Sequence, residues 1–217
     1  MKGWPFLNAI DRNQFINTEA DLRALIGFPG GLVLHKVISE IDPNCRDFIS
    51  KSPFVLLSTA DSEGKCDVSP RGDDPGFVYI IDHKHLVIPE RPGNKRMDSL
   101  RNILANPHIG LQFLIPGLGE TLRINGRAYI TKEEALLKKM AVKDRNPLIG
   151  IIVEVEECYM HCAKAFLRSQ LWTPETWLSK EDLPSPAKII SEHANVDGAT
   201  PEVIAARLAD GYKNRLY

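Results

Sequence analysis

Apolar and polar positions in the middle of the chain follow the spacing of short antiparallel strands. Residues 54–60 and 109–115 are apolar at most positions, which is typical of buried strands. Residues 121–131 alternate apolar and polar side chains, which is the period of a strand with one buried face. The same pattern predicts further strands over 66–71, 77–81, 86–89 and 149–155.

Helical spacing and end signals predict helices on both sides of these strands. Thr18 is a suitable N-cap for a helix that runs to about Ile26. Pro43 suits the first turn of a second helix. Proline has no backbone N–H, and an N–H in the first turn of a helix has no hydrogen-bond partner within the helix. Apolar residues at helical spacing predict a third helix over 95–104. Further helices are predicted over 132–142, 187–193 and 201–208.

The number of short strands, with few helices between them, favours a mainly β (α+β) fold. We expect a closed or partly open antiparallel barrel, because closing a sheet removes its unpaired edges. With 217 residues, of which 43% are apolar and 25% charged, the chain is long enough for one well-buried domain with appendages, or for two small domains.

Charge and cysteine content narrow the classes of partner. A formal net charge of -1 and a pI near 6.6 give no general attraction to nucleic acid or anionic lipid, so we expect small molecules or a second copy as partners. No apolar run approaches the roughly 20 residues that span a bilayer, and residues 1–5 do not resemble an export signal. We expect a cytoplasmic protein whose scattered cysteines are free thiols: Cys45, Cys66, Cys158 and Cys162.

Candidate chemistry lies in two polar segments, 68–76 and 88–96, at the ends of predicted strands. Arg71, Lys95 and Arg96 can donate charge-assisted hydrogen bonds to a phosphate, and a helix beginning at Lys95 would add backbone donors. Taken singly, each cation is equally compatible with a solvated or ion-paired surface residue. Taken together, they favour a phosphorylated cofactor.

The order of these elements resembles a known family. The strands, the hairpins and the segment Gly-Glu-Thr-Leu-Arg-Ile-Asn-Gly-Arg-Ala at 119–128 resemble the flavin-binding split barrel of pyridoxamine 5'-phosphate oxidases over about 53–140. His-Cys-Ala-Lys-Ala at 161–165 and Arg-Ser-x-Leu-Trp at 168–172 are similar to an uncharacterised branch of that superfamily, regarded as FMN-dependent. The resemblance implies a six-to-eight-stranded antiparallel split β-barrel with short flanking helices. Its parts would be an N-terminal helical extension packed on the barrel over 1–52, the FMN-binding barrel over 53–175 and a C-terminal helical tail over 176–217.

The same resemblance implies FMN as the cofactor and a set of residues that contact it. The open question at this stage is which of Asn94, Lys95 and Arg96 contacts the phosphate. The implied cofactor residues are Ser69, Pro70, Arg71, Gly72, Asp73, Ile88, Pro89, Asn94, Lys95, Arg96, Thr121, Lys164, Arg168 and Trp172. Ser69 and Thr121 are also compatible with ordinary strand hydroxyls, and Asp73 with a turn residue.

The implied function is FMN-dependent hydride transfer between flavin and an unknown small organic substrate, with no catalytic residue assigned. The implied assembly is a homodimer with FMN at the interface, in which Lys164, Arg168 and Trp172 reach the neighbour's flavin. Vitamin B6 oxidation itself has weak support, because the C-terminal Arg-x-His pattern of true pyridoxamine 5'-phosphate oxidases is absent.

Two other functions stay open from the sequence. One is a non-catalytic flavin carrier or sensor. The other is a haem-binding split barrel, whose axial ligand would be His161, His108 or His193. A zinc site at Cys158, His161 and Cys162 is not expected, because a fourth ligand is missing.

Overall fold

The computed structural model describes residues 11–217, which divide into two compact units with the boundary in the sequence after Val37. Residues 1–10 include the segment in which we found no export signal, and that expectation lies outside the described residues. The first unit contains η2 (Arg12–Gln14), α1 (Glu19–Ile26) and α2 (Gly31–His35). All strands found in residues 11–217 belong to the second unit, which begins at Ile38.

The first unit confirms the predicted start and end of α1. The Thr18 side chain accepts a hydrogen bond from the Asp21 amide at 3.1 Å, and Gly27 ends the helix with a φ of 84°. We did not predict α2, which has no side-chain cap. Neither helix contains a buried residue.

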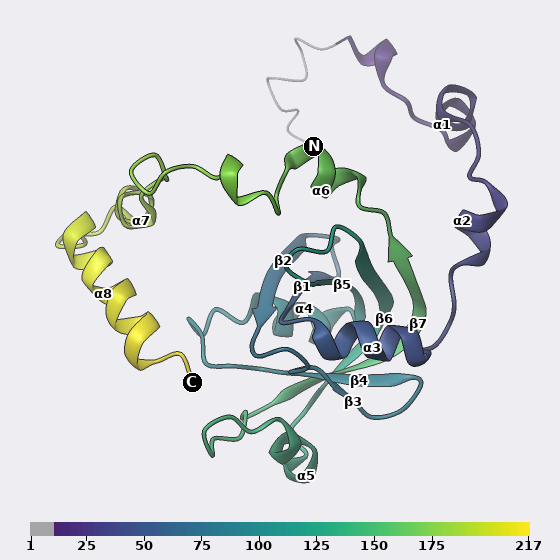
Figure 1. Cartoon of the computed structure of the whole chain (residues 1–217). Helices are drawn as coiled ribbons and strands as arrows, with labels where there is room; N and C mark the ends of the chain where they lie inside the picture. Colours follow the sequence, from purple (N-terminus) through teal and green to yellow (C-terminus); the bar gives the residue numbers. More distant parts are fainter. Residues whose placement is uncertain (1–10) are drawn as a thin grey trace. The chain divides into compact units, whose positions relative to one another are not determined.

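The second unit is built on one seven-stranded sheet in which every neighbouring pair is antiparallel. Figure 1 shows the strands curling round one another. The strands are β1 (Phe54–Ala60), β2 (Cys66–Gly72), β3 (Tyr79–Ile80), β4 (His85–Pro89), β5 (His108–Leu114), β6 (Thr121–Thr131) and β7 (Gly150–His161). Their order is β2-β1-β5-β6-β7-β4-β3, so β2 and β3 are the two edges. This arrangement confirms the predicted antiparallel split barrel.

The core fills the inside of this curved sheet. Leu57, Phe113, Leu122 and Ile151 are fully buried there, and removing their apolar surface from water is the main stabilising contribution. Two helices add to the same core: α3 (Pro43–Lys51) through Phe48 and Ile49, and α4 (Asp98–Ala105) through Leu100 and Ile103.

Several expected boundaries were wrong, and the strand expected over 77–81 is only the two residues of β3. The helix expected to begin at Lys95 begins at Asp98, because Lys95 and Met97 have φ values of 62° and 60°, outside the helical region. The strand expected over 149–155 continues to His161, where it still pairs with β6. The helix expected over 132–142 is shorter, with α5 (Glu134–Leu137) followed by η3 (Lys138–Met140).

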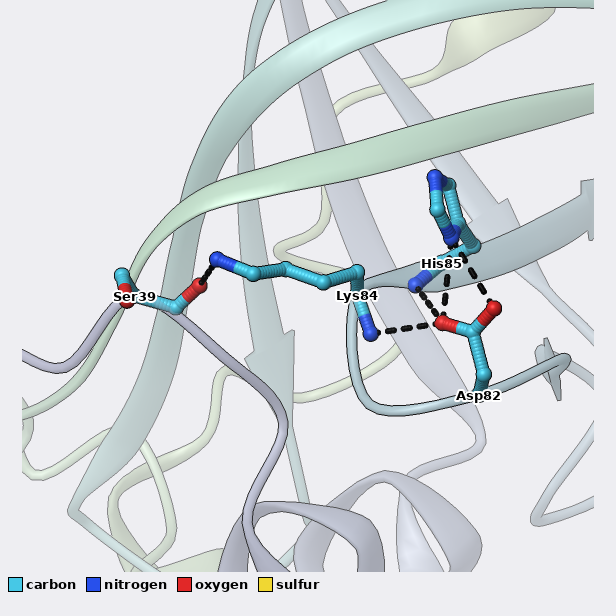
Figure 2. Close-up of polar contacts among 4 residues, drawn as sticks. All are labelled: Ser39, Asp82, Lys84 and His85. Carbon is cyan, nitrogen blue, oxygen red and sulfur yellow. Dashed lines mark hydrogen bonds and ion pairs between the residues drawn. The ribbon is translucent and has the colours of Figure 1, made fainter.

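A network of polar contacts fixes the turn between β3 and β4. The Asp82 carboxylate accepts hydrogen bonds from the amides of Lys84 and His85 and lies 3.0 Å from the His85 ring, as Figure 2 shows. Lys84 Nζ donates to the carbonyl oxygen of Ser39. The turn thereby holds the chain that leads into α3.

After β7 the chain forms α6 (Lys164–Ser169), η4 (Pro174–Thr176), α7 (Pro186–Ala194) and α8 (Pro201–Asn214). Both tail helices were predicted, although α8 extends beyond the expected end at residue 208. The limits of the three expected parts, at 52/53 and 175/176, stay a prediction. None of the helices within residues 11–217 combines the length and the apolar character that crossing a membrane requires.

Candidate cofactor site

The edge strand β2 turns one row of polar side chains toward the inside of the barrel. Register places Arg71 in one row with Val55, Phe113 and Leu122, all of which belong to the core. Ser69 and Asp73 are half-buried like Arg71, whereas Pro70 and Gly72 are exposed. The expected sharing of a face by Ser69 and Arg71 is therefore confirmed.

Two ion pairs join this edge to the chain that leaves β4. Arg71 pairs with Glu90, with 16% and 23% of the side chains exposed, and Asp73 pairs with Arg91 at 2.7 Å. Arg91 also donates to the carbonyl oxygen of Met140 at 2.9 Å. Because β2 and β4 are not neighbours in the sheet, these pairs bring two separate parts of the barrel wall together.

Asp73 is the most enclosed charge of this group, with 2% of its side chain exposed. Its carboxylate accepts hydrogen bonds from the Tyr217 hydroxyl at 2.7 Å and from the Asp74 amide at 2.9 Å. Burial by itself raises the pKa of Asp73, but these hydrogen bonds and the charge of Arg91 outweigh it, so the pKa of Asp73 lies below its usual value. The side chain is thus held as a carboxylate.

Two of the expected cofactor residues have a buried polar atom with no partner among residues 11–217: Arg71 at Nε and Thr121 at Oγ1. An unpaired buried donor is costly in a folded protein, and each one calls for an explanation. Thr121 is 1% exposed and lies one residue beyond the row of Arg71, at the same end of the sheet. The alternating burial along β6 turns Thr121 to the face opposite that of Leu122, and therefore opposite that of Arg71.

The expected contacts from β4 lie in the barrel wall. Ile88 is fully buried in the core and pairs with Ile151, and Pro89, also buried, pairs with Gly150. Pro89 ends β4 next to Glu90.

The expected phosphate loop, residues 94–96, is exposed. The Asn94 side chain accepts a hydrogen bond from the Arg96 amide at 2.9 Å, and Arg96 pairs with Asp98 at 2.5 Å. Because α4 begins at Asp98, the free amides at its start lie three residues later than expected. Lys95 is also exposed, and its backbone has a left-handed conformation with a φ of 62°.

The third expected group follows β7, at the end of the sheet where Thr121 pairs with His161. Lys164 and Arg168 are exposed on α6. Trp172 donates from Nε1 to the carbonyl oxygen of Leu118 at 2.9 Å and stacks on Phe166 with ring centroids 5.7 Å apart. Trp172 therefore attaches α6 to the turn that precedes Thr121.

The structure thus forms two clusters from the expected residues. One contains Arg71 and Asp73, with Ser69 on the same face of β2. The other lies near Thr121 and includes Trp172 and α6. Sequence reasoning gave no role to Glu90, Arg91 and Tyr217, which complete the first cluster. The signal for the first two was their position directly after a strand, but no local signal marks Tyr217.

Two of the four cysteines, Cys45 and Cys158, form a separate buried pair. Cys158 is buried and its Sγ lies 3.3 Å from Sγ of Cys45, whereas Cys162 is exposed. The hydrogen bond to Cys158, together with burial, raises the pKa of the Cys45 thiol. Among residues 11–217, no three His, Cys, Asp or Glu side chains are placed to hold a metal ion.

The chain matches a family model over more than half of its length. Residues 41–162 match the family model described as pyridoxamine 5'-phosphate oxidase. No sequence among the curated proteins matches the chain.

Several solved structures resemble the chain. HupZ from Group A Streptococcus is 22% identical over 54% of this chain and 91% of its own, with a TM-score of 0.45. An FMN-binding protein from Syntrophomonas wolfei is 9% identical over 54% and 88%, with a TM-score of 0.42. HutZ, the haem storage protein from Vibrio cholerae, is 12% identical over 56% and 93%, with a TM-score of 0.39.

Proposed function

Because this chain belongs to the pyridoxamine 5'-phosphate oxidase family, we propose that it binds FMN and is an FMN-dependent oxidoreductase. The reaction would transfer a hydride between flavin and a small organic substrate. Bound FMN supplies this two-electron chemistry through its ring system. The protein's part is to hold the phosphate, orient the ring and exclude water.

The observation that carries the proposal is the pair of unpaired buried atoms, Arg71 Nε and Thr121 Oγ1. Both belong to residues that the family resemblance assigns to the cofactor. A ligand that accepts a hydrogen bond from each would remove the cost of leaving them unpaired. The chemistry of the donor set therefore fits a phosphorylated flavin.

Arg71 is the principal phosphate ligand in this proposal. Its guanidinium keeps donors beyond the one that pairs with Glu90, since an arginine carries five N–H groups. Glu90 holds the guanidinium in place and also offsets its charge. Lys95 and Arg96 lie on the exposed loop after β4, and would add charge at the phosphate.

The opposite orientations of Arg71 and Thr121 support a site made by two protomers. One face of a single sheet presents one of these groups, and the other face presents the other. We propose a homodimer in which one protomer supplies Arg71 and the β2 edge, while its partner supplies Thr121 and α6. Twofold symmetry then gives two equivalent sites.

An absorption spectrum of the purified protein tests the cofactor directly. We expect the two-band spectrum of oxidised flavin, with FMN rather than FAD released on denaturation. Protein purified without flavin should quench FMN fluorescence on titration. A colourless protein that gives no quenching would contradict the proposal, and an intense haem band would favour a haem-binding role.

A second measurement separates an enzyme from a carrier. Flavin bound to an oxidoreductase should be reduced by a suitable donor and reoxidised by an acceptor over repeated cycles. Stable FMN binding with no turnover by a panel of reductants, including reduced nicotinamide nucleotides, would favour a carrier or sensor.

A further inference from the structure

Tyr217 contacts several residues of the second unit that lie far from it in the sequence. Its hydroxyl donates to Asp73 Oδ1 at 2.7 Å, and its main-chain oxygen accepts a hydrogen bond from Arg145 at 2.7 Å. The Arg91 guanidinium and the Lys143 ammonium lie 5.9 Å and 5.0 Å from the centre of its ring. A single aromatic side chain thus contacts an acceptor and two cations.

These contacts match the chemistry of a phenol. The ring face is negative and attracts the two cations, whereas the hydroxyl is a donor that a carboxylate accepts strongly. Asp73 suits this role because its carboxylate is ionised and enclosed, with Arg91 holding its other oxygen. A phenylalanine ring would keep the cation contacts and leave the acceptor without this donor.

Tyr217 also lies beside two small cavities. Asp73 and Arg91, which it contacts, line a cavity of about 170 Å³ together with Tyr79 and Lys139. Tyr217 itself lines a second cavity of about 240 Å³ with Lys143 and Arg145. The residues that Tyr217 contacts therefore line one small cavity, and Tyr217 itself lines the other.

The segment that carries Tyr217 has few other attachments. In α7 and α8 the buried residues are Ala187 and Ile204, and neither belongs to the core of the barrel. Within the described chain, the side-chain hydrogen bonds that join residues 185–217 to the rest of the second unit are the two made at Tyr217. The contact can therefore open without disturbing the sheet.

We propose that Asp73, Arg91 and Lys143 form a binding site for small phenols, which Tyr217 of the same chain fills. Asp73 accepts the hydroxyl proton in a hydrogen bond, and the two cations hold the ring. Tethering gives the tyrosine a local concentration in the millimolar range, so a free phenol competes with it poorly. Removing the tyrosine ring opens the site.

The test is a titration of the full chain with 4-fluorophenol, followed by fluorine NMR. We expect Tyr217→Ala to bind the probe at least tenfold more tightly than the unaltered protein. Tyr212→Ala is the matched control, because Tyr212 lies on α8 with 70% of its surface exposed. It should behave like the unaltered protein.

Two further measurements identify the groups involved. In the Tyr217→Ala background, fluorobenzene should bind about tenfold more weakly than 4-fluorophenol, since it lacks the hydroxyl that Asp73 accepts. Lys143→Gln in the same background should weaken 4-fluorophenol about twofold to fivefold. Equal affinity of Tyr217→Ala and the unaltered protein for the phenol, or equal binding of both probes, would overturn the proposal.

A phenol could also bind at the proposed flavin site, so the two sites have to be separated. Adding Arg71→Ala to Tyr217→Ala should leave the affinity for 4-fluorophenol within twofold, because Arg71 contacts Glu90 and not the tyrosine. Loss of phenol binding in this double variant would overturn the assignment to Asp73. The titration uses no flavin, so its result is independent of whether FMN binds.

Discussion

Arg71 and Glu90, which are 19 residues apart in the sequence, form an ion pair between two parts of the barrel wall that are not neighbours in the sheet. The pair has two consequences. It fixes the edge strand β2 against the chain that leaves β4, and it places a partly neutralised guanidinium at the proposed phosphate site.

The first prediction concerns the phosphate. Arg71→Ala should weaken FMN binding about tenfold to a hundredfold, because the loss of a charge-assisted hydrogen bond costs about 1.5 to 3 kcal/mol. Riboflavin, which lacks the phosphate, should lose much less. Fluorescence titrations with both ligands measure the difference.

A second variant tests the same prediction at the exposed loop, residues 94–96. Lys95→Ala combined with Arg96→Ala should show the same selective loss, since both side chains are exposed and Arg96, although paired with Asp98, keeps further donors for an added phosphate. Equal losses for FMN and riboflavin would mean that these residues support the fold or the ring instead.

The second prediction concerns Thr121. Thr121→Val removes a buried hydroxyl that has no partner among residues 11–217, so the flavin-free protein should keep its stability or gain up to about 1 kcal/mol. Flavin binding should weaken if the hydroxyl contacts the cofactor. Urea unfolding and FMN titration of the same variant give the two results.

Thr59→Val is the matched control for this variant. Thr59 is also buried, but its Oγ1 accepts a hydrogen bond from Asn102 at 3.0 Å. Removing that oxygen takes a hydrogen-bond partner from the half-buried Asn102 amide and should cost about 1 kcal/mol. A loss of similar size in Thr121→Val would show that its hydroxyl has a partner in the folded, flavin-free protein.

The third prediction follows from the lowered pKa of Asp73. A carboxyl whose pKa is lower in the folded protein stabilises it above its unfolded pKa of about 3.9, and this contribution is lost as the pH falls through the folded value. The unaltered protein should therefore exceed Asp73→Asn in stability at neutral pH, and the difference should shrink below about pH 4. Urea unfolding between neutral and acidic pH measures this difference in stability.

Asp74→Asn is the control for this prediction. Asp74 is the exposed neighbour of Asp73, and its replacement keeps the ion pair between Asp73 and Arg91. A constant difference at every pH would contradict the argument.

Local patterns were sufficient to predict much of the sheet. The bounds of β1 and β6 agree with the expected ranges, because one is a bounded apolar run and the other alternates without interruption. The start of α4 could not be predicted in this way. Lys95 and Met97 adopt positive φ, and neither is a glycine or asparagine that would signal it.

The candidate site was less accessible to sequence reasoning, for a physical reason. Arg71 was identified from its residue type and position, but its partner Glu90 depends on how the sheet curves. The contact between Asp73 and Tyr217 joins residues 144 positions apart, and no local pattern encodes such a pair. The opposite faces of Arg71 and Thr121 follow only once the register of β1, β5 and β6 is known.

The fourth prediction concerns the β-bulge between Asn125 and Gly126. A Cβ atom at Gly126 would lie 2.0 Å from the carbonyl oxygen of Glu154, so Gly126→Ala forces the backbones of β6 and β7 apart. We expect a loss of about 2 to 4 kcal/mol in the free energy of unfolding, measured in urea. Gly93→Ala is the control, because a Cβ there would meet no atom within 4 Å. Equal stability of the two variants would show that the bulge is not as close-packed as described.

The fifth prediction concerns the division of the site between protomers. If α6 meets the neighbour's flavin, a variant lacking Arg71, Lys95 and Arg96 and a second variant with Lys164→Ala, Arg168→Ala and Trp172→Ala should each bind FMN poorly as homodimers. Because Trp172 also donates to Leu118, Trp172→Phe replaces Trp172→Ala if the second variant unfolds at a lower temperature.

Mixing the two variants tests the arrangement itself. In a heterodimer one site collects both sets of defects and the other is intact, so about one flavin per heterodimer should bind. Differently tagged protomers, purified as the mixed species, allow the flavin content to be measured by absorbance after denaturation. If proven heterodimers bind no more FMN than the parent homodimers, Arg71 and α6 do not act across a dimer interface. Binding at one site per heterodimer would place the cations of one protomer and the helix of its partner on the same flavin, which is the arrangement that we propose from the opposite faces of Arg71 and Thr121.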